Sequence, residues 1–187
     1  MSTRGNGWED STERLELHRP VRGDISGLYE ILSDSRVWGH YPSQRHTSPE
    51  QTEASVQRWI AGWNEVGLGT WVARACGDAQ IVGYGGCTVR HGAAWNLGYR
   101  LAVHAQGRGL ATELARRALE RATGADPHLP VIAYLLEHNK ASAAVAKKLG
   151  MSLAYRGPDT ANPDAAAIRL IYADRPLTDE QLTAIRH

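Results

Sequence analysis

The six residues from Gln106 to Ala111 constrain the fold of this chain more than any other stretch of its sequence. Two glycines stand there, directly before an amphipathic helical pattern that runs from Gly107 to about Ala122. The first turn of a helix leaves N–H groups without partners and carries the positive end of the helix dipole. Glycine has no Cβ, so the backbone can approach a ligand closely. The stretch therefore predicts an anion site suited to a diphosphate.

The glycines alone leave another interpretation open, because Gly-x-Gly ahead of a helix also fits a plain tight turn. Two familiar nucleotide motifs are excluded. No third glycine follows at the dinucleotide-binding spacing, and no Lys-Ser/Thr pair follows as in a P-loop. Arg108 lies between the two glycines and can add positive charge to an anion site.

Strand patterns and helix patterns alternate along the chain. Apolar alternation and β-branched runs predict strands at residues 15–18, 70–73, 81–84, 95–103, 130–135, 153–156 and 168–173. Helical spacing and capping residues predict helices from Asp24 to Leu32, from Ser48 to Gly67, from Gly107 to about Ala122, from Lys140 to Leu149 and after Thr178. The early strands predict an antiparallel meander. The strand, helix, strand order that follows predicts a parallel crossover and a mixed sheet.

Composition excludes several classes of protein. A length of 187 residues lies within the range of one domain, and a formal net charge of +1 offers no field that would hold a nucleic acid. Cys76 and Cys87 form no CxxC pair and have no His cluster nearby, which predicts neither a disulfide framework nor a zinc site. The polar leader from Met1 to Asp10 and the lack of any long apolar window predict no membrane partner and a cytoplasmic location.

Gln106-x-x-Gly109-x-Ala111 resembles the Gln/Arg-x-x-Gly-x-Gly/Ala pyrophosphate motif of the GNAT superfamily of N-acetyltransferases. The preceding segment, Leu97 to Leu101, is similar to that family's fourth strand. Roughly thirty residues after the motif, the segment from Asn139 to Met151 is similar to the second coenzyme-binding segment of ribosomal-protein alanine acetyltransferases. The opening Leu15-x-Leu17-x-Arg19-Pro20 resembles the first strand of that branch, and the likeness extends from about Leu15 to Ala173.

The resemblance implies an α/β domain with a mixed, mostly antiparallel central sheet and helices on both faces. It divides the chain into a flexible leader at 1–13, an acetyltransferase domain at 14–175 and a C-terminal extension at 176–187. It also implies acetyl-CoA as co-substrate, no metal, and a fourth and fifth strand that splay apart around the pantetheine arm. The coenzyme-binding residues that it implies are Leu101, Ala102, Val103, Gln106, Gly107, Arg108, Gly109, Leu110, Ala111, Thr112, Asn139 and Ser142.

Two catalytic positions depart from the pattern of many relatives. Where those relatives have a general-acid Tyr, this chain has Ala146, so Ser142 is the substitute that we expect; it also fits a buried helix face. Where relatives often have a Glu, this chain has Asn96, which takes up no proton at neutral pH. The general base is then one that acts through a water molecule, or the reaction uses no general base. Asn139 bonds the pantetheine, caps its helix, or does both.

The acceptor side has several candidates. His40, Tyr41 and His46 lie where the family places part of the acceptor pocket, and each is either a pocket residue or a solvated loop residue. Trp59 and Trp63 share a helix face and are either core or acceptor lining.

We expect acetyl transfer to a primary amine, by direct attack in a ternary complex, in a monomer or a homodimer. The acceptor is a protein N-terminus or a small amine. The stretch from Arg36 to Ser48 has no acidic cluster to select a polycationic aminoglycoside. The alternative is a non-catalytic acyl-CoA-binding module, which the Asn96 and Ala146 replacements favour.

Overall fold

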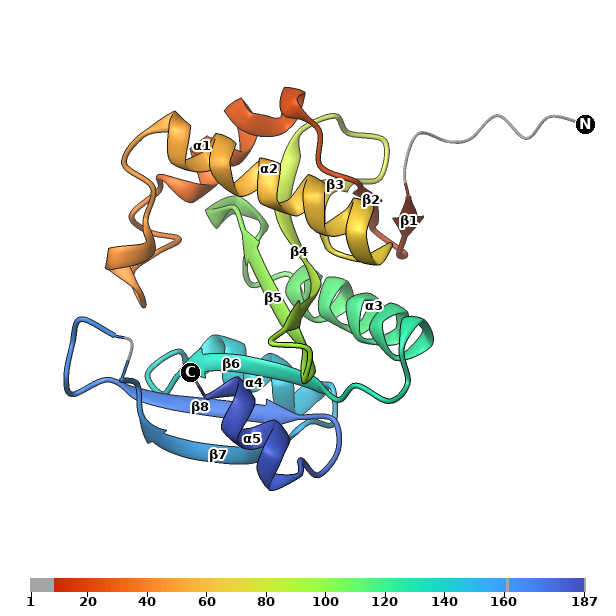
Figure 1. The fold of residues 1–187 in the computed structure, drawn as a ribbon. Coiled ribbons are helices and arrows are strands. Elements are labelled where there is room, and N and C mark those ends of the chain that lie inside the picture. The colour runs from red at the N-terminus through yellow and green to blue at the C-terminus, as the bar shows by residue number, and fades with distance from the viewer. Residues whose placement is uncertain (1–8, 161, 187) are drawn as a thin grey trace, which may run out of the picture.

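An eight-stranded sheet runs through the molecule in the order β1-β2-β3-β4-β5-β6-β8-β7 (Figure 1). The computed structural model describes residues 9–160 and 162–186. Neighbouring strands are antiparallel except β5 and β6, which are parallel and joined through a helix. The strands are β1 (Asp10–Ser11), β2 (Leu15–His18), β3 (Thr70–Ala75), β4 (Ile81–Arg90), β5 (Ala94–Leu101), β6 (Val131–Leu136), β7 (Ser152–Pro158) and β8 (Ile168–Ala173). The mixed, mostly antiparallel sheet that the sequence predicts is confirmed.

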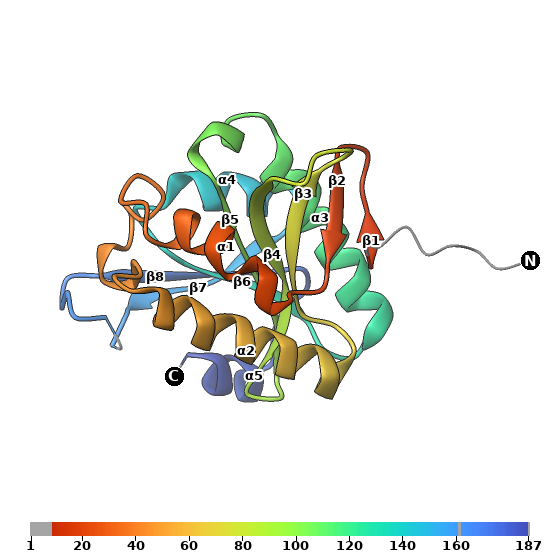
Figure 2. The ribbon, with the colours of Figure 1, turned by 90° about the horizontal axis from the view of Figure 1, so that it is seen from above.

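Helices cover both faces of the sheet, as Figure 2 shows from above. One face carries α1 (Ile25–Leu32), α2 (Pro49–Val66) and α5 (Asp179–Ile185), and the other carries α3 (Leu110–Ala125) and α4 (Lys140–Lys148). Short 3-10 turns occur at Arg22–Asp24, Pro42–Gln44 and Val103–Ala105. Within the described residues, no helix combines the length and the apolar character that a membrane crossing requires.

Alternation along β5 gives the strand two different faces. Leu97 and Leu101 are buried in the core cluster that includes Leu110 and Leu114 of α3. Asn96, Gly98 and Arg100 lie at the alternate positions and face α1 and α2, because successive side chains of a strand point to opposite faces, whereas Tyr99 packs against the same cluster as Leu97 and Leu101. β5 therefore separates two layers, and each layer contributes to the site described below.

Helix boundaries follow the capping residues in one predicted helix and depart from them in another. Ser48 and Gln51 form a capping box at the start of α2, which ends at Gly67 in the left-handed conformation at φ 75°. Asp24 stands at the N-cap position of α1, as predicted, but its side chain makes no capping hydrogen bond there. Its carboxylate accepts a hydrogen bond from the Val21 N–H at 2.8 Å and pairs with Arg74, so it stabilises the turn before α1 instead.

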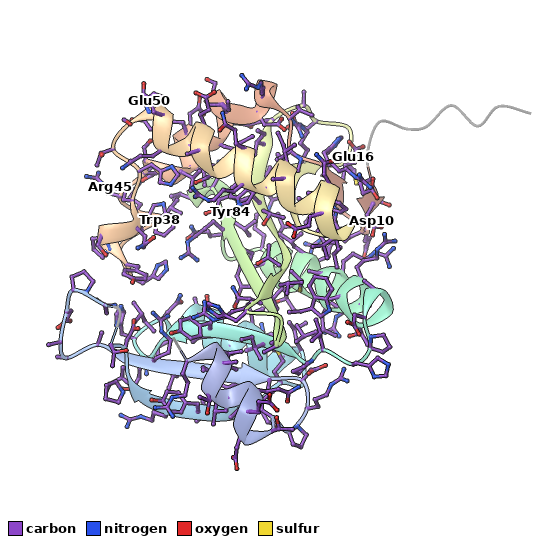
Figure 3. All side chains as sticks on the ribbon, viewed as in Figure 1. Asp10, Glu16, Trp38, Arg45, Glu50 and Tyr84 are labelled. Atoms are coloured by element: carbon purple, nitrogen blue, oxygen red, sulfur yellow. The ribbon has the colours of Figure 1, made fainter. Side chains whose placement is uncertain are left out.

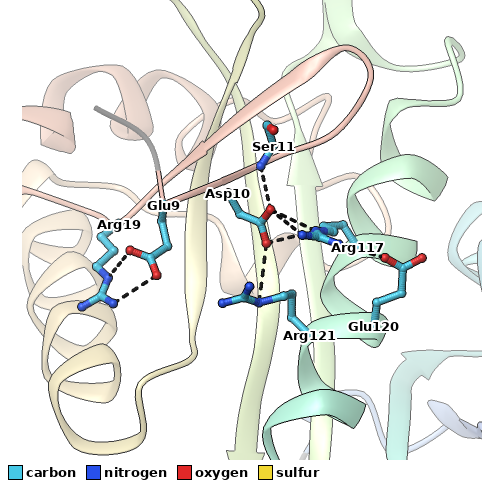
Figure 4. Close-up of polar contacts among 7 residues, drawn as sticks. All are labelled: Glu9, Asp10, Ser11, Arg19, Arg117, Glu120 and Arg121. Carbon is cyan, nitrogen blue, oxygen red and sulfur yellow. Dashed lines mark hydrogen bonds and ion pairs between the residues drawn. The ribbon is translucent and has the colours of Figure 1, made fainter. Parts of the chain in front are cut away.

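The first described residues belong to the sheet. Asp10 pairs with Leu17 in the β1–β2 ladder, and its carboxylate bonds Arg117 and Arg121 of α3 (Figure 4). The Arg117 pair spans 2.8 Å and the Arg121 pair 3.5 Å. The expected flexible leader is therefore wrong from Glu9 onward, and its earlier residues lie outside the described part of the chain.

The predicted C-terminal extension packs onto the sheet as a helix. Thr178 accepts a hydrogen bond from the Gln181 N–H at 3.1 Å, which caps α5 as the sequence predicts. Ile185 has no exposed surface and lies in a cluster with Ile132 and Ile171. The extension therefore completes one face of the fold.

We expect Ile185→Ala to lower the free energy of unfolding by about 2–4 kcal/mol, because a large side chain leaves a buried site. Thr183→Ala, on the exposed side of the same helix, should change it by less than ~0.5 kcal/mol. Urea titration of both variants measures the difference. Equal stability of the two variants would show that α5 is not docked.

Candidate functional site

The site begins where β5 and β6 separate. The two strands pair only at Trp95 with Val131 and at Asn96 with Ile132, near their starts. Beyond those pairs each strand continues without the other, although β5 stays paired to β4 along its whole length. This is the splay that the sequence resemblance implies.

Main-chain groups of β5 point into this opening. The Ala102 N–H donates to the Val82 carbonyl at 2.9 Å, on the β4 side. Because main-chain groups alternate between the two edges of an antiparallel strand, those of Tyr99 and Leu101 point to the opposite edge, where β6 has moved away. The Leu101 carbonyl there accepts from the Gln106 side-chain amide at 3.0 Å. An extended ligand can bond such an edge as an added strand does.

The glycine loop lies at the mouth of the opening. Gly107 and Gly109 have φ values of 72° and 81°, in the left-handed region, and Gly109 is the N-cap of α3. A Cβ at Gly107 would meet nothing within 4 Å, and one at Gly109 would meet only the tip of Arg14, at 3.5 Å. Both glycines are exposed. The first turn of α3 thus presents open main-chain N–H groups to an anion.

Residues of the N-terminal hairpin hold this loop in place. Arg14 donates from Nη1 to the Arg108 carbonyl at 2.9 Å and from Nε to Glu113 at 2.7 Å. Burial raises the pKa of Glu113, but hydrogen bonds from Thr12 and Arg14 outweigh burial and bring the pKa below its ordinary value. The carboxylate in the first turn of α3 is therefore charged, and Arg14 neutralises it beside the anion site.

A cavity of about 390 Å³ runs from the glycine loop to α4 and brings together most of the predicted coenzyme-binding residues. Arg100, Val145 and Lys148 contribute further to its walls. The predicted residues that line it are Leu101, Gln106, Gly107, Gly109, Leu110, Ala111, Thr112, Asn139 and Ser142.

Three predicted coenzyme residues lie outside that lining. Ala102 has its side chain in the core cluster of α1 and α2 and its N–H on β4, so both are occupied. Val103 starts the 3-10 turn, in which its carbonyl accepts from the Gln106 N–H at 3.2 Å. Arg108 is exposed, and its carbonyl is bonded to Arg14. The expectation of free main-chain groups from 101 to 103 is therefore wrong at 102.

Ser142 lies beside an aromatic hydroxyl. Asn139 caps α4 by accepting from the Ser142 N–H at 3.1 Å, as predicted for a cap. The Ser142 side chain is also close enough to the Tyr99 hydroxyl to lower its pKa. Burial raises the pKa of Tyr99, and the bond to Ser142 and the charge on Arg100 oppose the rise. The Tyr99 hydroxyl thus stays protonated at neutral pH and can donate a hydrogen bond into the opening.

A second cavity, of about 240 Å³, lies on the other face of β5, toward α2. Asn96, predicted as catalytic, lines this cavity and not the first one. Figure 3 shows Tyr84 beneath α2, with Trp38 on the connection between α1 and α2. The cavity is lined by Trp38, Trp59, Thr70, Tyr84, Gly86, Thr88, Asn96, Gly98, Tyr99 and Arg100. Tyr99 and Arg100 line both cavities, so the two meet at the β5 edge.

The loop candidates separate into different roles. His40 lines the first cavity, and with Tyr41 it also lines a small cavity of about 80 Å³ between β5, β6 and α4. His46 bonds Thr52 of α2 at 2.8 Å and lies outside these cavities. Trp63 is core, with its Nε1–H on the Thr70 carbonyl. Trp59 alone of the tryptophan pair lines the second cavity.

Sequence reasoning missed Tyr99, Arg100 and Trp38 as site residues. Tyr99 and Arg100 could have been predicted from strand alternation, since a splayed strand exposes both of its faces. Trp38 carried no signal, because it lies in an irregular connection whose path depends on tertiary packing. Among residues 9–160 and 162–186, no group of three or more His, Cys, Asp and Glu side chains is placed to hold a metal ion.

Both the sequence and the fold match known proteins. The profile of the acetyltransferase (GNAT) domain family matches residues 14–152. The chain therefore belongs to the GNAT acetyltransferase family.

Solved structures of low sequence identity share the fold. A GNAT-family acetyltransferase from Bacillus anthracis is 20% identical with a TM-score of 0.74, over 87% of this chain and 95% of that chain. The ribosomal-protein-S5-alanine acetyltransferase from Vibrio fischeri is 15% identical with a TM-score of 0.74, over 91% and 97%. RimL, a ribosomal L7/L12 alpha-N-protein acetyltransferase in complex with coenzyme A, is 19% identical with a TM-score of 0.73, over 90% and 97%.

Burial lowers the pKa of His40 from 6.5 to about 4, and the charges on Arg100 and His138 add to the effect. The unfolded chain then binds more protons than the folded chain between these two pH values. We therefore expect the free energy of unfolding to fall as pH drops from about 7 to about 4. His40→Asn should flatten this slope in denaturant titrations across the range. An unchanged slope would show that the His40 side chain is solvated and not buried.

Proposed function

We propose that the protein transfers the acetyl group of acetyl-CoA to a primary amine by direct attack in a ternary complex. The observation that carries this proposal is the continuous path from the N-terminus of α3, through the cavity of about 390 Å³, to the β5 edge where the second cavity meets it. Such a path places a diphosphate, an extended arm and a thioester in sequence. The coenzyme A bound to the RimL structure supports the same assignment.

The residues present fit coenzyme A. The N–H groups at the start of α3 and the open space at Gly107 and Gly109 suit the diphosphate, and Arg14 removes the repulsion that Glu113 would otherwise exert on it. The main-chain edge at Tyr99 and Leu101 suits the pantetheine amides. Bound acetyl-CoA supplies an activated acyl group, and no further cofactor enters the proposal.

The protein contributes hydrogen-bond donors to the transfer. A main-chain N–H of β5 that points into the opening, at Tyr99 or Leu101, stabilises negative charge on the carbonyl oxygen, worth about 3 kcal/mol for one well-placed donor. The hydroxyl pair of Tyr99 and Ser142 supplies one free O–H, which donates to the departing sulfur, while the other O–H bonds within the pair. A thiolate with a pKa near that of cysteine, ~8.5, needs little more help.

Proton removal from the amine relies on solvent in this proposal. No Asp or Glu lines either cavity or the small one between them, and His40 remains a weak base because its pKa is about 4. Asn96 lines the second cavity but takes no proton. The acceptor therefore enters as the free amine or loses its proton to water, and we expect activity to rise toward alkaline pH.

The alternative function is an acyl-CoA-binding module without turnover. The lack of a carboxylate in the cavities, with Asn96 and Ala146 at positions where relatives carry ionisable groups, favours this second candidate. Thiol release from acetyl-CoA across a panel of amines and peptides separates the two. Calorimetric binding of acetyl-CoA without release of thiol for any acceptor would support the module.

We propose that the protein works in the reducing cytoplasm, because both of its cysteines are free.

Gly109→Glu should weaken acetyl-CoA binding more than ~100-fold, because a carboxylate would stand in the phosphate cradle. Gly124→Glu puts the same charge near the far end of α3 and serves as the matched control. Isothermal calorimetry measures both affinities. Gly109→Asn tolerates positive φ and adds no charge, so it tests whether strain alone causes a loss. Unchanged affinity in Gly109→Glu contradicts the cradle.

Ser142→Ala should lower kcat about 10-fold with little change in acetyl-CoA affinity, because its hydroxyl acts on the leaving sulfur. Tyr99→Phe should give a similar loss, and the double variant should lose little more, since the two hydroxyls act as a pair. Steady-state kinetics and calorimetry together provide the test. Parental kcat in Ser142→Ala would return Ser142 to a packing role on α4.

A further inference from the structure

The cavity on the α2 side of β5 is hollow at Gly98, which has no side chain to fill it. Gly98 pairs with Gly86 of β4, where a Cβ would instead strike the Gly69 carbonyl of the connection to β3. A Cβ at Gly98 would meet nothing within 4 Å, so a side chain there would project into open space. Trp38, Trp59 and neighbouring aromatic rings form the walls. The result is an apolar chamber that suits a compact, partly aromatic acceptor.

Arg100 brings a positive charge into this chamber that no carboxylate balances. It is half-buried, lies over the Trp38 ring at 4.4 Å and donates from Nη1 to the Tyr99 carbonyl at 3.0 Å. Among the described residues it has no ion-pair partner within 4.0 Å, and its Nε has no hydrogen-bond partner. Since no Asp or Glu lines the chamber, the missing anion has to come from a ligand.

Two more polar atoms in the chamber lack partners. Within the described part of the chain, the Trp38 Nε1–H has no acceptor and the Asn96 Oδ1 has no donor. Both atoms have almost no accessible surface, so neither faces the open space of the chamber. Asn96 and Arg100 lie on the same face of β5, four positions and thus about 13 Å apart along the strand. The amine and carboxylate of one amino acid are much closer together than this, so Arg100 alone sets the position of such an acceptor.

We propose that the acceptor is a free amino acid or dipeptide with an apolar or aromatic side chain. Arg100 binds its carboxylate, and its amine lies at the β5 edge where the two cavities meet. This inference rests on the proposed acetyl transfer and deepens it, because it selects a small zwitterion over the N-terminus of a folded protein. A protein N-terminus has no carboxylate at this distance to satisfy Arg100.

The reaction balances without any additional reactant. The amine nitrogen forms a bond to the acetyl carbonyl carbon while the carbon–sulfur bond of acetyl-CoA breaks. The nitrogen loses one proton to water, the sulfur leaves as thiolate and takes up one proton, and the products are the N-acetyl amino acid and coenzyme A. The carboxylate at Arg100 does not change during the transfer.

The test compares acids with their amides. Thiol release is measured with tryptophan, phenylalanine and leucine, with Leu-Phe as dipeptide, with the carboxamide of each, and with an octapeptide amide that mimics a protein N-terminus. We expect kcat/KM to be at least ~10-fold higher for each acid than for its amide, the factor that one lost charge-assisted bond gives. Comparison of kcat/KM for the free amino acids with that for Leu-Phe identifies the preferred acceptor length. Equal values for acid and amide, or preference for the octapeptide amide, would overturn the inference and leave acetyl transfer intact.

Variants assign the preference to Arg100. Arg100→Gln, measured at saturating acetyl-CoA, should bring the acid-to-amide ratio close to one, and Arg100→Lys should restore part of the ratio. Arg45→Gln, on the same connection as Trp38 but outside the cavities, is the matched control and should keep the parental ratio. A loss of acetyl-CoA affinity in Arg100→Gln with an unchanged ratio would assign Arg100 to the coenzyme and overturn the proposal.

A binding measurement keeps the inference separate from turnover. Calorimetry with coenzyme A already bound should show tighter binding of tryptophan than of its carboxamide, again by at least ~10-fold, even in a protein that releases no thiol. Absence of that difference would overturn the inference. Lack of thiol release with every acceptor, alongside a clear binding difference, would overturn the proposed transfer instead and leave the amino acid site standing.

Discussion

The parting of β5 from β6 is the constraint on which the rest of the site depends. Two paired positions hold the strands together at Trp95 and Asn96, and beyond them the sheet is interrupted at its centre. An interior gap of this kind leaves main-chain groups unsatisfied, which a sheet tolerates only at a functional position. α3 and α4 close one side of the gap, and the α1–α2 connection closes the other. The gap is thus held open by elements from both halves of the chain.

The sequence predicted the elements well where local rules decide them. The capping box at Ser48 and the Thr178 cap place helix starts correctly, because each depends on a few neighbouring residues, whereas α3 starts at Leu110, three residues after the predicted Gly107. The strand alternation also predicted the sheet class. Asp24 failed as a cap because Arg74, fifty positions away, binds its carboxylate. Local rules carry no information about such a partner.

Like the fold, the site was predictable from the sequence only where local patterns decide it. Six lining residues of the first cavity fall between Gln106 and Thr112, so one motif identifies the end of the cavity at α3. The acceptor side is assembled from β3, β4, β5, α2 and the connection that holds Trp38, and each supplies only one or a few residues. No single stretch has enough of them to form a motif. Arg100 stands out as a site residue only because no carboxylate lines the cavity around it.

The clamp between Thr12, Arg14 and Glu113 has a consequence for how the chain matures. Thr12 and Glu113 are separated by 101 positions, so the hairpin is synthesised long before the helix that it holds. Contacts between such distant segments form late and slowly during folding. The nascent hairpin therefore cannot make these contacts before α3 has left the ribosome, and until then nothing from the hairpin holds the loop between Gln106 and Leu110.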